Sequence, residues 1–361
     1  MSNEVIFFGG FLLFIILMLS MDLGLFNKRD HAVGLKEAAI MSAVWVSLAI
    51  AFYFLLLTEG HRLHGIEDFD RLAFITKKHF HNIQLNPLDF YSSLQLYKQN
   101  LALEFLSGYV VEYALSVDNI FVMVLIFTAF SVETKYYHRV LFWGIIGAVV
   151  MRFLFIFLGS ALISQFGWIL YLFGAFLVYT GFMMFLHRNQ EDKIDPQNHK
   201  VVKLASRYFS VYPQFSGNKF FLKKDGKKYI TPLFLVLLII EFTDLIFAVD
   251  SIPAIFAVTK DPYIVFFSNI FAILGLRSMF FLLVNIIHKF RYLKIGLSVL
   301  LVFIGAKMLA HNWLDAIGFT TAHSLIVIVL ILTISVIFSL LFPRKSPRKA
   351  KESKKNFKPG I

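Results

Sequence analysis

The sequence is dominated by apolar stretches of about 20 residues, the length that an α-helix needs to cross the hydrocarbon core of a bilayer. With 58% hydrophobic and only 16% charged residues, the chain is too apolar for an ordinary soluble domain. The pattern predicts an all-α polytopic membrane protein with about nine transmembrane helices. The predicted spans are residues 5–25, 38–57, 102–127, 139–159, 163–186, 232–257, 264–287, 293–311 and 323–342.

Basic residues indicate how these spans are oriented. Many Lys and Arg residues lie between 187 and 231 and in the tail after Phe342. The positive-inside rule places both segments in the cytoplasm and the N-terminus outside. Membrane topology therefore explains the net charge of +12, and we expect no nucleic-acid partner. The chain then divides into two N-terminal transmembrane helices (1–57), an extracytoplasmic loop (58–101), a first three-helix block (102–186), a cytoplasmic loop (187–231), a second three-helix block (232–311), a final transmembrane helix (312–342) and a basic cytoplasmic tail (343–361).

Two acidic motifs stand out within the apolar sequence. Glu112 is followed six positions later by Asp118, and Asp244 is followed six positions later by Asp250. An ionised Asp near the centre of a bilayer costs about 2.5–3.5 kcal/mol, and such residues usually face a bundle interior or a water-filled pathway. We therefore predict that these acids serve a function inside the membrane.

The two motifs begin two blocks whose later features also correspond. Arg152 lies one span after the first motif, and Arg277 lies one span after the second. Because three spans separate equivalent points, the second block must enter the membrane from the opposite side, which gives a 3+3 inverted repeat. Secondary transporters often use inverted repeats, with the substrate near the midplane at the repeat interface.

The predicted spans contain more acidic than basic side chains. Full ionisation would leave an excess of negative charge, which either protons on some carboxyls or a bound divalent cation could offset. The structural alternative is a set of buried salt bridges, in which Arg152 and Arg277 neutralise part of the acids. The acids are Asp22, Glu112, Asp118, Glu241, Asp244 and Asp250, and Lys307 is a third cation that either snorkels to the interface or lines the pathway.

Helix geometry separates the two acids of a motif. At about 100° per residue, Asp118 lies roughly 120° around the helix from Glu112. Either the helix is locally unwound, or the two acids border different parts of a cavity. Pro253, three residues after Asp250, has no amide hydrogen and predicts a break that frees the carbonyl of Val249 as a further ligand.

The side chains available as ligands limit which metal ions the site could bind. Carboxylates, together with the side chains of Ser116, Asn119 and Ser251, suit Mg²⁺, Ca²⁺ or Mn²⁺. The chain has no cysteine, which excludes thiolate metal sites, Fe–S clusters and disulfides. It also lacks a phosphate-binding glycine loop, a His-Glu-x-x-His motif and a serine-protease arrangement, so we predict neither enzymatic activity nor a cofactor.

The predicted loop 58–101 is rich in histidine. It contains His61, His64, His79 and His81 among aromatic and acidic residues. One interpretation is that these histidines bind zinc or manganese ions outside the membrane. Scattered surface histidines are the simpler interpretation, and we take it as the expectation.

Three segments carry a family resemblance. They are Ser20-Met-Asp22-Leu, Glu112-Tyr-Ala-Leu-Ser-Val-Asp118-Asn119, and Glu241-Phe-Thr-Asp244-Leu-Ile-Phe-Ala-Val-Asp250-Ser251-Ile-Pro253-Ala. These segments are similar to the hallmark segments of TerC-family integral membrane proteins, and the resemblance covers roughly residues 5–342. It implies a bacterial inner-membrane protein in a lineage that includes manganese exporters, with other members linked by name to tellurium resistance or to thylakoid protein insertion. The family's acidic residues correspond to Asp22, Glu112, Asp118, Glu241, Asp244 and Asp250.

We therefore expect Mn²⁺ export by a secondary, proton-coupled mechanism, with Asn119 and Ser251 beside the acidic ligands and with Arg152 and Arg277 as gating or charge partners. One alternative is an exchanger of Ca²⁺ or another cation. A second alternative is a membrane-protein assembly or insertion factor, whose buried acids are structural and whose basic loops contact partner proteins. Besides the transported cation, the expected partners are the lipid bilayer and protons as the coupling ion. The sequence predicts no particular protein partner.

Overall fold

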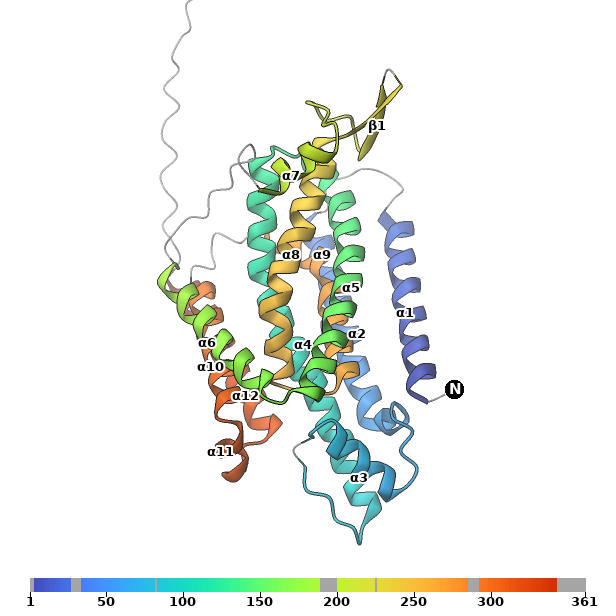
Figure 1. Cartoon of the computed structure of the whole chain (residues 1–361), viewed down its shortest axis with the longest axis vertical. Coiled ribbons are helices and arrows are strands. Elements are labelled where there is room, and N and C mark those ends of the chain that lie inside the picture. Colours follow the sequence, from blue (N-terminus) through green and yellow to red (C-terminus); the bar gives the residue numbers. More distant parts are fainter. Residues whose placement is uncertain are drawn as a thin grey trace, which may run out of the picture.

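The structure, a computed structural model, describes residues 3–26, 34–81, 83–188, 200–224, 226–284 and 292–342. Its helices form an elongated bundle, with α7 and a β-hairpin at one end and α3 at the other (Figure 1). The elements are α1 (Asn3–Phe26), α2 (Leu35–Glu59), the 3-10 helix η1 (Gly60–Arg62), α3 (Phe69–Lys78), α4 (Phe90–Ala129), α5 (Thr134–Gln165), α6 (Ile169–Leu186), α7 (Lys200–Tyr208), β1 (Phe221–Lys224), β2 (Lys227–Ile230), α8 (Pro232–Phe256), α9 (Pro262–Leu283), α10 (Leu293–Leu309), α11 (His311–Ala316) and α12 (Thr321–Leu341).

The all-α polytopic class is confirmed, and each predicted span coincides for most of its length with one helix. Within the part of the chain that the structure describes, seven helices are long and apolar enough to cross a membrane, namely α2, α4, α5, α6, α8, α9 and α12. Helix α1 contains a shorter apolar stretch, Glu4–Ser20, and α10 has 17 residues. The number of nine spans and the inverted repeat therefore stay predictions.

Helix α9 lies at the centre of the bundle. All residues in its most apolar stretch are buried, and α2, α4 and α5 pack around the helix. The rings of Phe267 and Phe271 lie 4.4 and 5.7 Å from that of Phe11 on α1, and 5.4 and 5.0 Å from that of Phe52 on α2. Such aromatic pairs add to the stabilisation from burial. An enclosed helix can hold a polar side chain away from lipid, as α9 does with Asn269.

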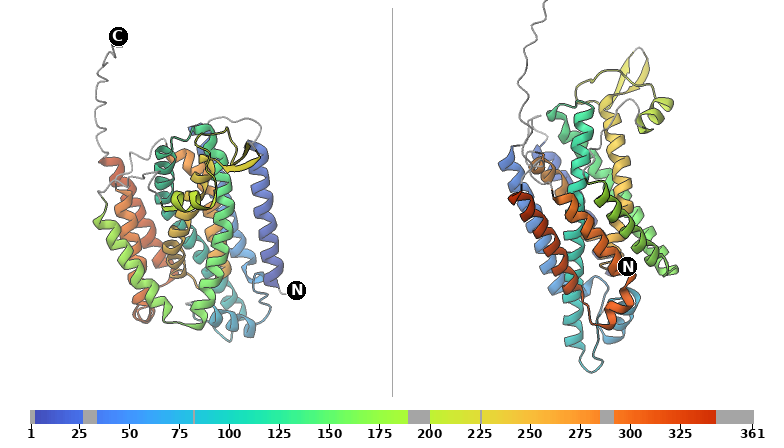
Figure 2. Two further views of the ribbon diagram at one scale, coloured as in Figure 1. Left: turned by 45° about the horizontal axis from the view of Figure 1, so that its top comes forward. Right: turned by 90° about the vertical axis from the view of Figure 1, so that its left-hand side faces the viewer.

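The two predicted blocks pack against each other reciprocally. Helix α4 contacts α9, α5 contacts α8, and α6 contacts α10, which lies with α6 and α12 on one side of the molecule (Figure 2). Helices α6 and α10 meet through glycines. A Cβ on Gly305 would lie 2.6 Å from the carbonyl oxygen of Gly174, and a Cβ on Gly181 would lie 2.8 Å from that of Ser298. Small residues permit this close backbone approach between membrane helices.

The segment predicted as the loop 58–101 is largely helical. It contains η1 and α3, and residues 90–101 form the first turns of α4. Asp89 begins α4 by accepting a hydrogen bond from the amide of Ser92 at 3.0 Å, and Tyr97 and Leu101 are buried against the bundle. With 40 residues, α4 is about 60 Å long and extends beyond the bilayer core.

The expectation of scattered surface histidines is wrong for three of the four. His64, His79 and His81 are 0%, 6% and 6% exposed. Although burial opposes its charge, the neighbouring Asp261 carboxylate raises the pKa of His64 to about 9, whereas burial lowers the pKa of His79 to about 4. The sequence did not reveal this cluster because Asp261 follows His64 by 197 residues.

The predicted loop 187–231 includes the short helix α7 and a β-hairpin. Strands β1 and β2 are antiparallel, with Phe221 opposite Ile230 and Lys224 opposite Lys227. Gly226 has φ of +76° in the connecting turn, a conformation that favours glycine. The predicted basic tail, 343–361, lies outside the described residues.

Candidate functional site

Both acidic motifs lie on continuous helices. Helix α4 runs unbroken past Glu112 and Asp118, so local unwinding does not bring these two acids together. The predicted break at Pro253 is wrong, because α8 continues through this residue to Phe256. Pro253 lies in the last turn of α8, where it removes one hydrogen bond without interrupting the rest of the helix. The two acids of each motif therefore point in different directions.

The first acids of the two motifs meet at Arg152. This α5 residue is 1% exposed and forms ion pairs with Glu112 of α4 and with Asp244 of α8, the latter at 3.5 Å between Nη2 and Oδ1. Its Nη1 donates to Oγ of Ser251 at 3.0 Å and to Oδ1 of Asn269 at 2.9 Å. Asn269 in turn donates from Nδ2 to Oε2 of Glu112 at 3.3 Å. We call these five residues the arginine cluster.

The arginine cluster is buried and rich in charge-assisted hydrogen bonds. Glu112 and Asp244 are 0% and 5% exposed. Removing such charges from water is costly, and close ion pairs with additional hydrogen bonds offset that cost. Within the described part of the chain, Nε of Arg152 and Oδ2 of Asp244 are buried without a hydrogen-bond partner. Glu112 and Asp244 each form a buried salt bridge with Arg152, as expected if these acids have a structural role.

The second acids of the two motifs lie in a different environment. Asp118 of α4 and Asp250 of α8 are half-buried, and they are close enough for their negative charges to act on each other. We call them the aspartate pair. They occupy equivalent positions in the two motifs, as Glu112 and Asp244 do in the arginine cluster. A divalent cation between two such carboxylates would replace their repulsion with attraction.

Glu241 is a third half-buried acid on α8. Its carboxylate fits over Gly147 of α5, because a Cβ at this glycine would lie only 2.1 Å from Oε1 of Glu241. Its negative charge also acts on Asp244, one helical turn away. Glu241 therefore lies next to the arginine cluster without being one of the ligands of Arg152 among the described contacts.

The other predicted residues are not members of the arginine cluster or the aspartate pair among the described contacts. Asn119 is buried on α4, outside the hydrogen bonds that the structure describes around Arg152. Arg277 is 5% exposed on α9, two turns beyond Asn269, and is not a member of the arginine cluster. Lys307 donates to Oγ of Ser324 on α12 at 3.2 Å, which places it away from Arg152. The side chain of Asp22 lies outside the described residues.

Sequence reasoning missed Asn269. The residue is 0% exposed and bridges Glu112 and Arg152. An amide in an otherwise apolar span was the available signal, but it is weaker than that of an intramembrane acid because an amide carries no charge.

Comparison with known proteins identifies relatives along most of the chain. The profile described as "Integral membrane protein TerC family" matches residues 97–347. "Uncharacterized membrane protein STKORF319" of Myxococcus xanthus is 45% identical over 300 residues, which cover 83% of this chain and 82% of that protein. "Putative membrane-bound redox modulator Alx" of Escherichia coli K12 is 43% identical over 307 residues, covering 83% and 84%, and the protein of the same name from Salmonella typhi is 41% identical over 335 residues, covering 91% and 92%. No solved structure matches the chain.

Proposed function

Because this chain belongs to the TerC family of integral membrane proteins, we propose that it exports Mn²⁺ across the bacterial cytoplasmic membrane as a secondary transporter. The observation that carries the proposal is the aspartate pair. Asp118 and Asp250 come from equivalent positions of two motifs, lie on two different helices and are only half-buried. In the proposed topology the N-terminus is outside and the basic tail is in the cytoplasm.

The aspartate pair supports a hard divalent cation as cargo. Its carboxylate oxygens are ligands that suit Mn²⁺, Mg²⁺ and Ca²⁺. A cation held between α4 and α8 would connect the two predicted repeat blocks. Rocking of one block against the other would then expose the cation to alternate sides of the membrane, as in other transporters with inverted repeats.

Proton exchange follows from the charge of the same pair. Release of the cation leaves Asp118 and Asp250 as neighbouring like charges, and uptake of a proton relieves their repulsion. The arginine cluster has a different role in this proposal. Arg152 stays charged and fixes Glu112 and Asp244, so these two acids hold α4, α5 and α8 together while the aspartate pair exchanges ions.

The name of the E. coli relative refers to redox modulation. This chain has no cysteine, so thiol–disulfide exchange within it cannot provide such a role. Transport of a redox-active metal ion would explain a redox effect without a redox centre in the protein. The proposal therefore attributes no enzymatic activity to the chain.

A liposome assay tests the proposal. Purified protein is reconstituted with a Mn²⁺-sensitive dye inside, and flux is measured under a pH gradient and under a membrane potential. We expect flux in the wild type and its loss in Asp118→Asn and Asp250→Asn. Glu133→Gln is the control, because this exposed residue forms a surface ion pair with Lys135 at 2.6 Å.

The same assay separates transport from the alternatives. If the wild type moves no divalent cation under either gradient, the proposal fails and an assembly or insertion factor becomes the better interpretation. Flux of Ca²⁺, Mg²⁺, Fe²⁺ or Zn²⁺ in preference to Mn²⁺ would keep a cation transporter but change its cargo. Undiminished flux in both aspartate variants would remove the aspartate pair from the mechanism.

A further inference from the structure

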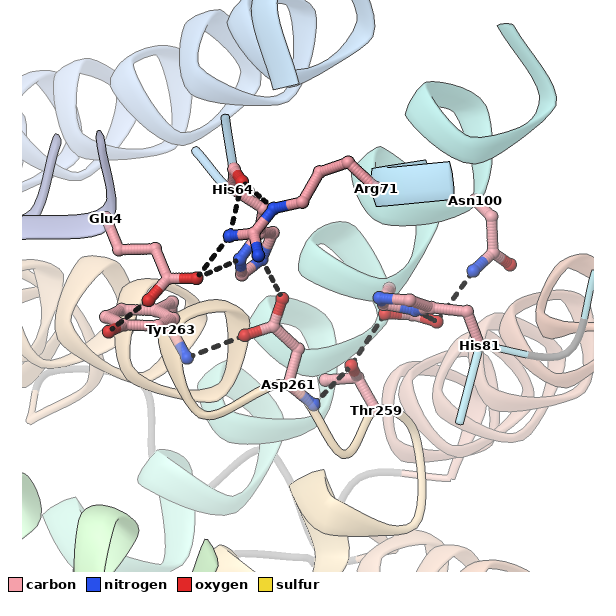
Figure 3. Close-up of polar contacts among 9 residues, drawn as sticks. Glu4, His64, Arg71, His81, Asn100, Thr259, Asp261 and Tyr263 are labelled. Atoms are coloured by element: carbon pink, nitrogen blue, oxygen red, sulfur yellow. Dashed lines mark hydrogen bonds and ion pairs between the residues drawn. The ribbon is translucent and has the colours of Figure 1, made fainter. Parts of the chain in front are cut away.

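A cluster of histidines and acids, part of which Figure 3 shows, lies where α3 ends at His79 and α9 begins after Asp261. It joins the connection between α2 and α4 to the first turn of α9. One ligand atom from each of His64, His79 and Asp261 lies within 4.8 Å of the other two, and all three residues are buried. From this geometry we propose that His64, His79 and Asp261 bind a divalent transition-metal ion of the Zn²⁺ class.

The ligand atoms already lie close together. Nε2 of His64 is 2.8 Å from Oδ2 of Asp261, and the rings of His64 and His79 are 5.0 Å apart between centroids. Zinc sites use His nitrogens and carboxylate oxygens at about 2.0–2.2 Å, and three protein ligands leave a position open for water. Modest side-chain adjustments would therefore suffice to surround an ion. Two nitrogens and one oxygen favour Zn²⁺ or Co²⁺ over the harder Mg²⁺ and Ca²⁺.

An unsatisfied nitrogen gives a second indication. His79 is 6% exposed, yet its Nε2 is buried and has no hydrogen-bond partner among the described residues. Buried polar groups are normally satisfied, so an orphaned ring nitrogen beside a carboxylate and a second imidazole requires an explanation. A metal ion bound by His79 would satisfy that side chain.

The surroundings hold the ligands in position as metal sites require. Nδ1 of His64 faces Oε1 of Glu4 at 3.3 Å, and a carboxylate on the second ring nitrogen is the usual partner of a metal-binding histidine. Asp261 is fixed through Oδ1, which accepts a hydrogen bond from the amide of Tyr263 at 2.9 Å. Its own amide donates to Oγ1 of Thr259 at 3.2 Å.

A neighbouring acid extends the same network. Oε1 of Glu104 contacts Nδ1 of His81 at 2.9 Å and accepts a hydrogen bond from Asn100 at 2.7 Å. Its Oε2 accepts a hydrogen bond from Thr259 at 2.6 Å. These contacts fix His81 and Glu104 next to the proposed ligands, so a bound ion would secure the connection between α2 and α4 onto α9.

Co²⁺ binding to the purified full-length protein tests the site, because Co²⁺ with nitrogen and oxygen ligands absorbs visible light and Zn²⁺ should displace it. All proteins carry Asp118→Asn and Asp250→Asn, which removes the proposed cargo site and keeps the two proposals separable. In this background we expect one equivalent of Co²⁺ to bind. His79→Ala and Asp261→Asn should each weaken binding by at least about tenfold, and Glu4→Gln by about 10- to 100-fold.

Two variants distinguish loss of metal binding from loss of folding. In Asp261→Asn the side-chain amide oxygen can still accept the hydrogen bond from the amide of Tyr263, so this variant preserves the helix cap even if His79→Ala fails to fold. His61→Ala is the matched control, because His61 lies in the same segment but is not one of the three proposed ligands. The Co²⁺ affinity of this variant should equal that of the background protein. The proposal would be overturned if the background protein showed no saturable Co²⁺ binding. It would also be overturned if Asp261→Asn and Glu4→Gln both bound Co²⁺ as tightly as the background protein.

Discussion

The arginine cluster and the aspartate pair contain equivalent residues of the same two motifs, yet their environments differ. Glu112 and Asp244 are almost completely buried and share the guanidinium of Arg152. Asp118 and Asp250 lie six residues further along each helix, are half-buried and act on each other as like charges. This difference is the basis of the division of labour that we propose, in which the first acid of each motif holds helices together and the second acid binds the transported ion.

Substitution of Arg152 should give the largest effect on stability. Arg152→Met leaves Glu112 and Asp244 buried without their shared cation, and breaking a buried pair in this way costs about 3–5 kcal/mol. Unfolding in detergent, followed by circular dichroism, measures the loss. Arg139→Met on the same helix is the control, because Arg139 is exposed and should change the unfolding free energy by less than about 1 kcal/mol. Equal losses for both variants would contradict the structural role of the cluster.

Asn269→Leu should have the next largest effect. The substitution removes the hydrogen bond to Arg152 and the one to Glu112, and a hydrogen bond to a charged group contributes about 1.5–3 kcal/mol. Asn119→Leu is matched in chemistry and burial but lies outside the described hydrogen bonds of the arginine cluster. Its unfolding free energy should change less. A larger loss for Asn119→Leu would show that Asn269 does not support the cluster.

Gly147→Ala should have a small effect on stability and a clear effect on flux. The new methyl would displace the carboxylate of Glu241, but this is the flexible end of a half-buried side chain, so the cost should fall below the 1–3 kcal/mol typical of overpacking. We expect Mn²⁺ flux in liposomes to decrease, because Glu241 is one of the acids predicted to bind the cation. Gly144→Ala is the control, because its Cβ would meet Ile240 at an ordinary 3.5 Å. Equal flux in both variants would exclude Glu241 from the pathway.

Particular residues show what the sequence can and cannot predict. Apolar length located the helices. Helical rotation left two alternatives for Glu112 and Asp118, and the continuous helix α4 excludes local unwinding. The cost of intramembrane charge identified the acids but gave no signal for Asn269, which is polar without being charged. Pro253 was misread as a break because the missing amide hydrogen was taken to interrupt the helix, whereas in the last turn of α8 it removes only one hydrogen bond. The buried histidines were missed because their partner Asp261 is distant in sequence.

The most direct test compares one acid from each environment on the same helix. Asp244→Asn and Asp250→Asn are reconstituted side by side, and both Mn²⁺ flux and thermal unfolding are measured. The division of labour predicts that Asp250→Asn abolishes flux with an unfolding temperature close to that of the wild type, whereas Asp244→Asn lowers the unfolding temperature and retains flux per folded molecule. Wild-type flux in Asp250→Asn, together with unchanged stability in Asp244→Asn, would contradict it.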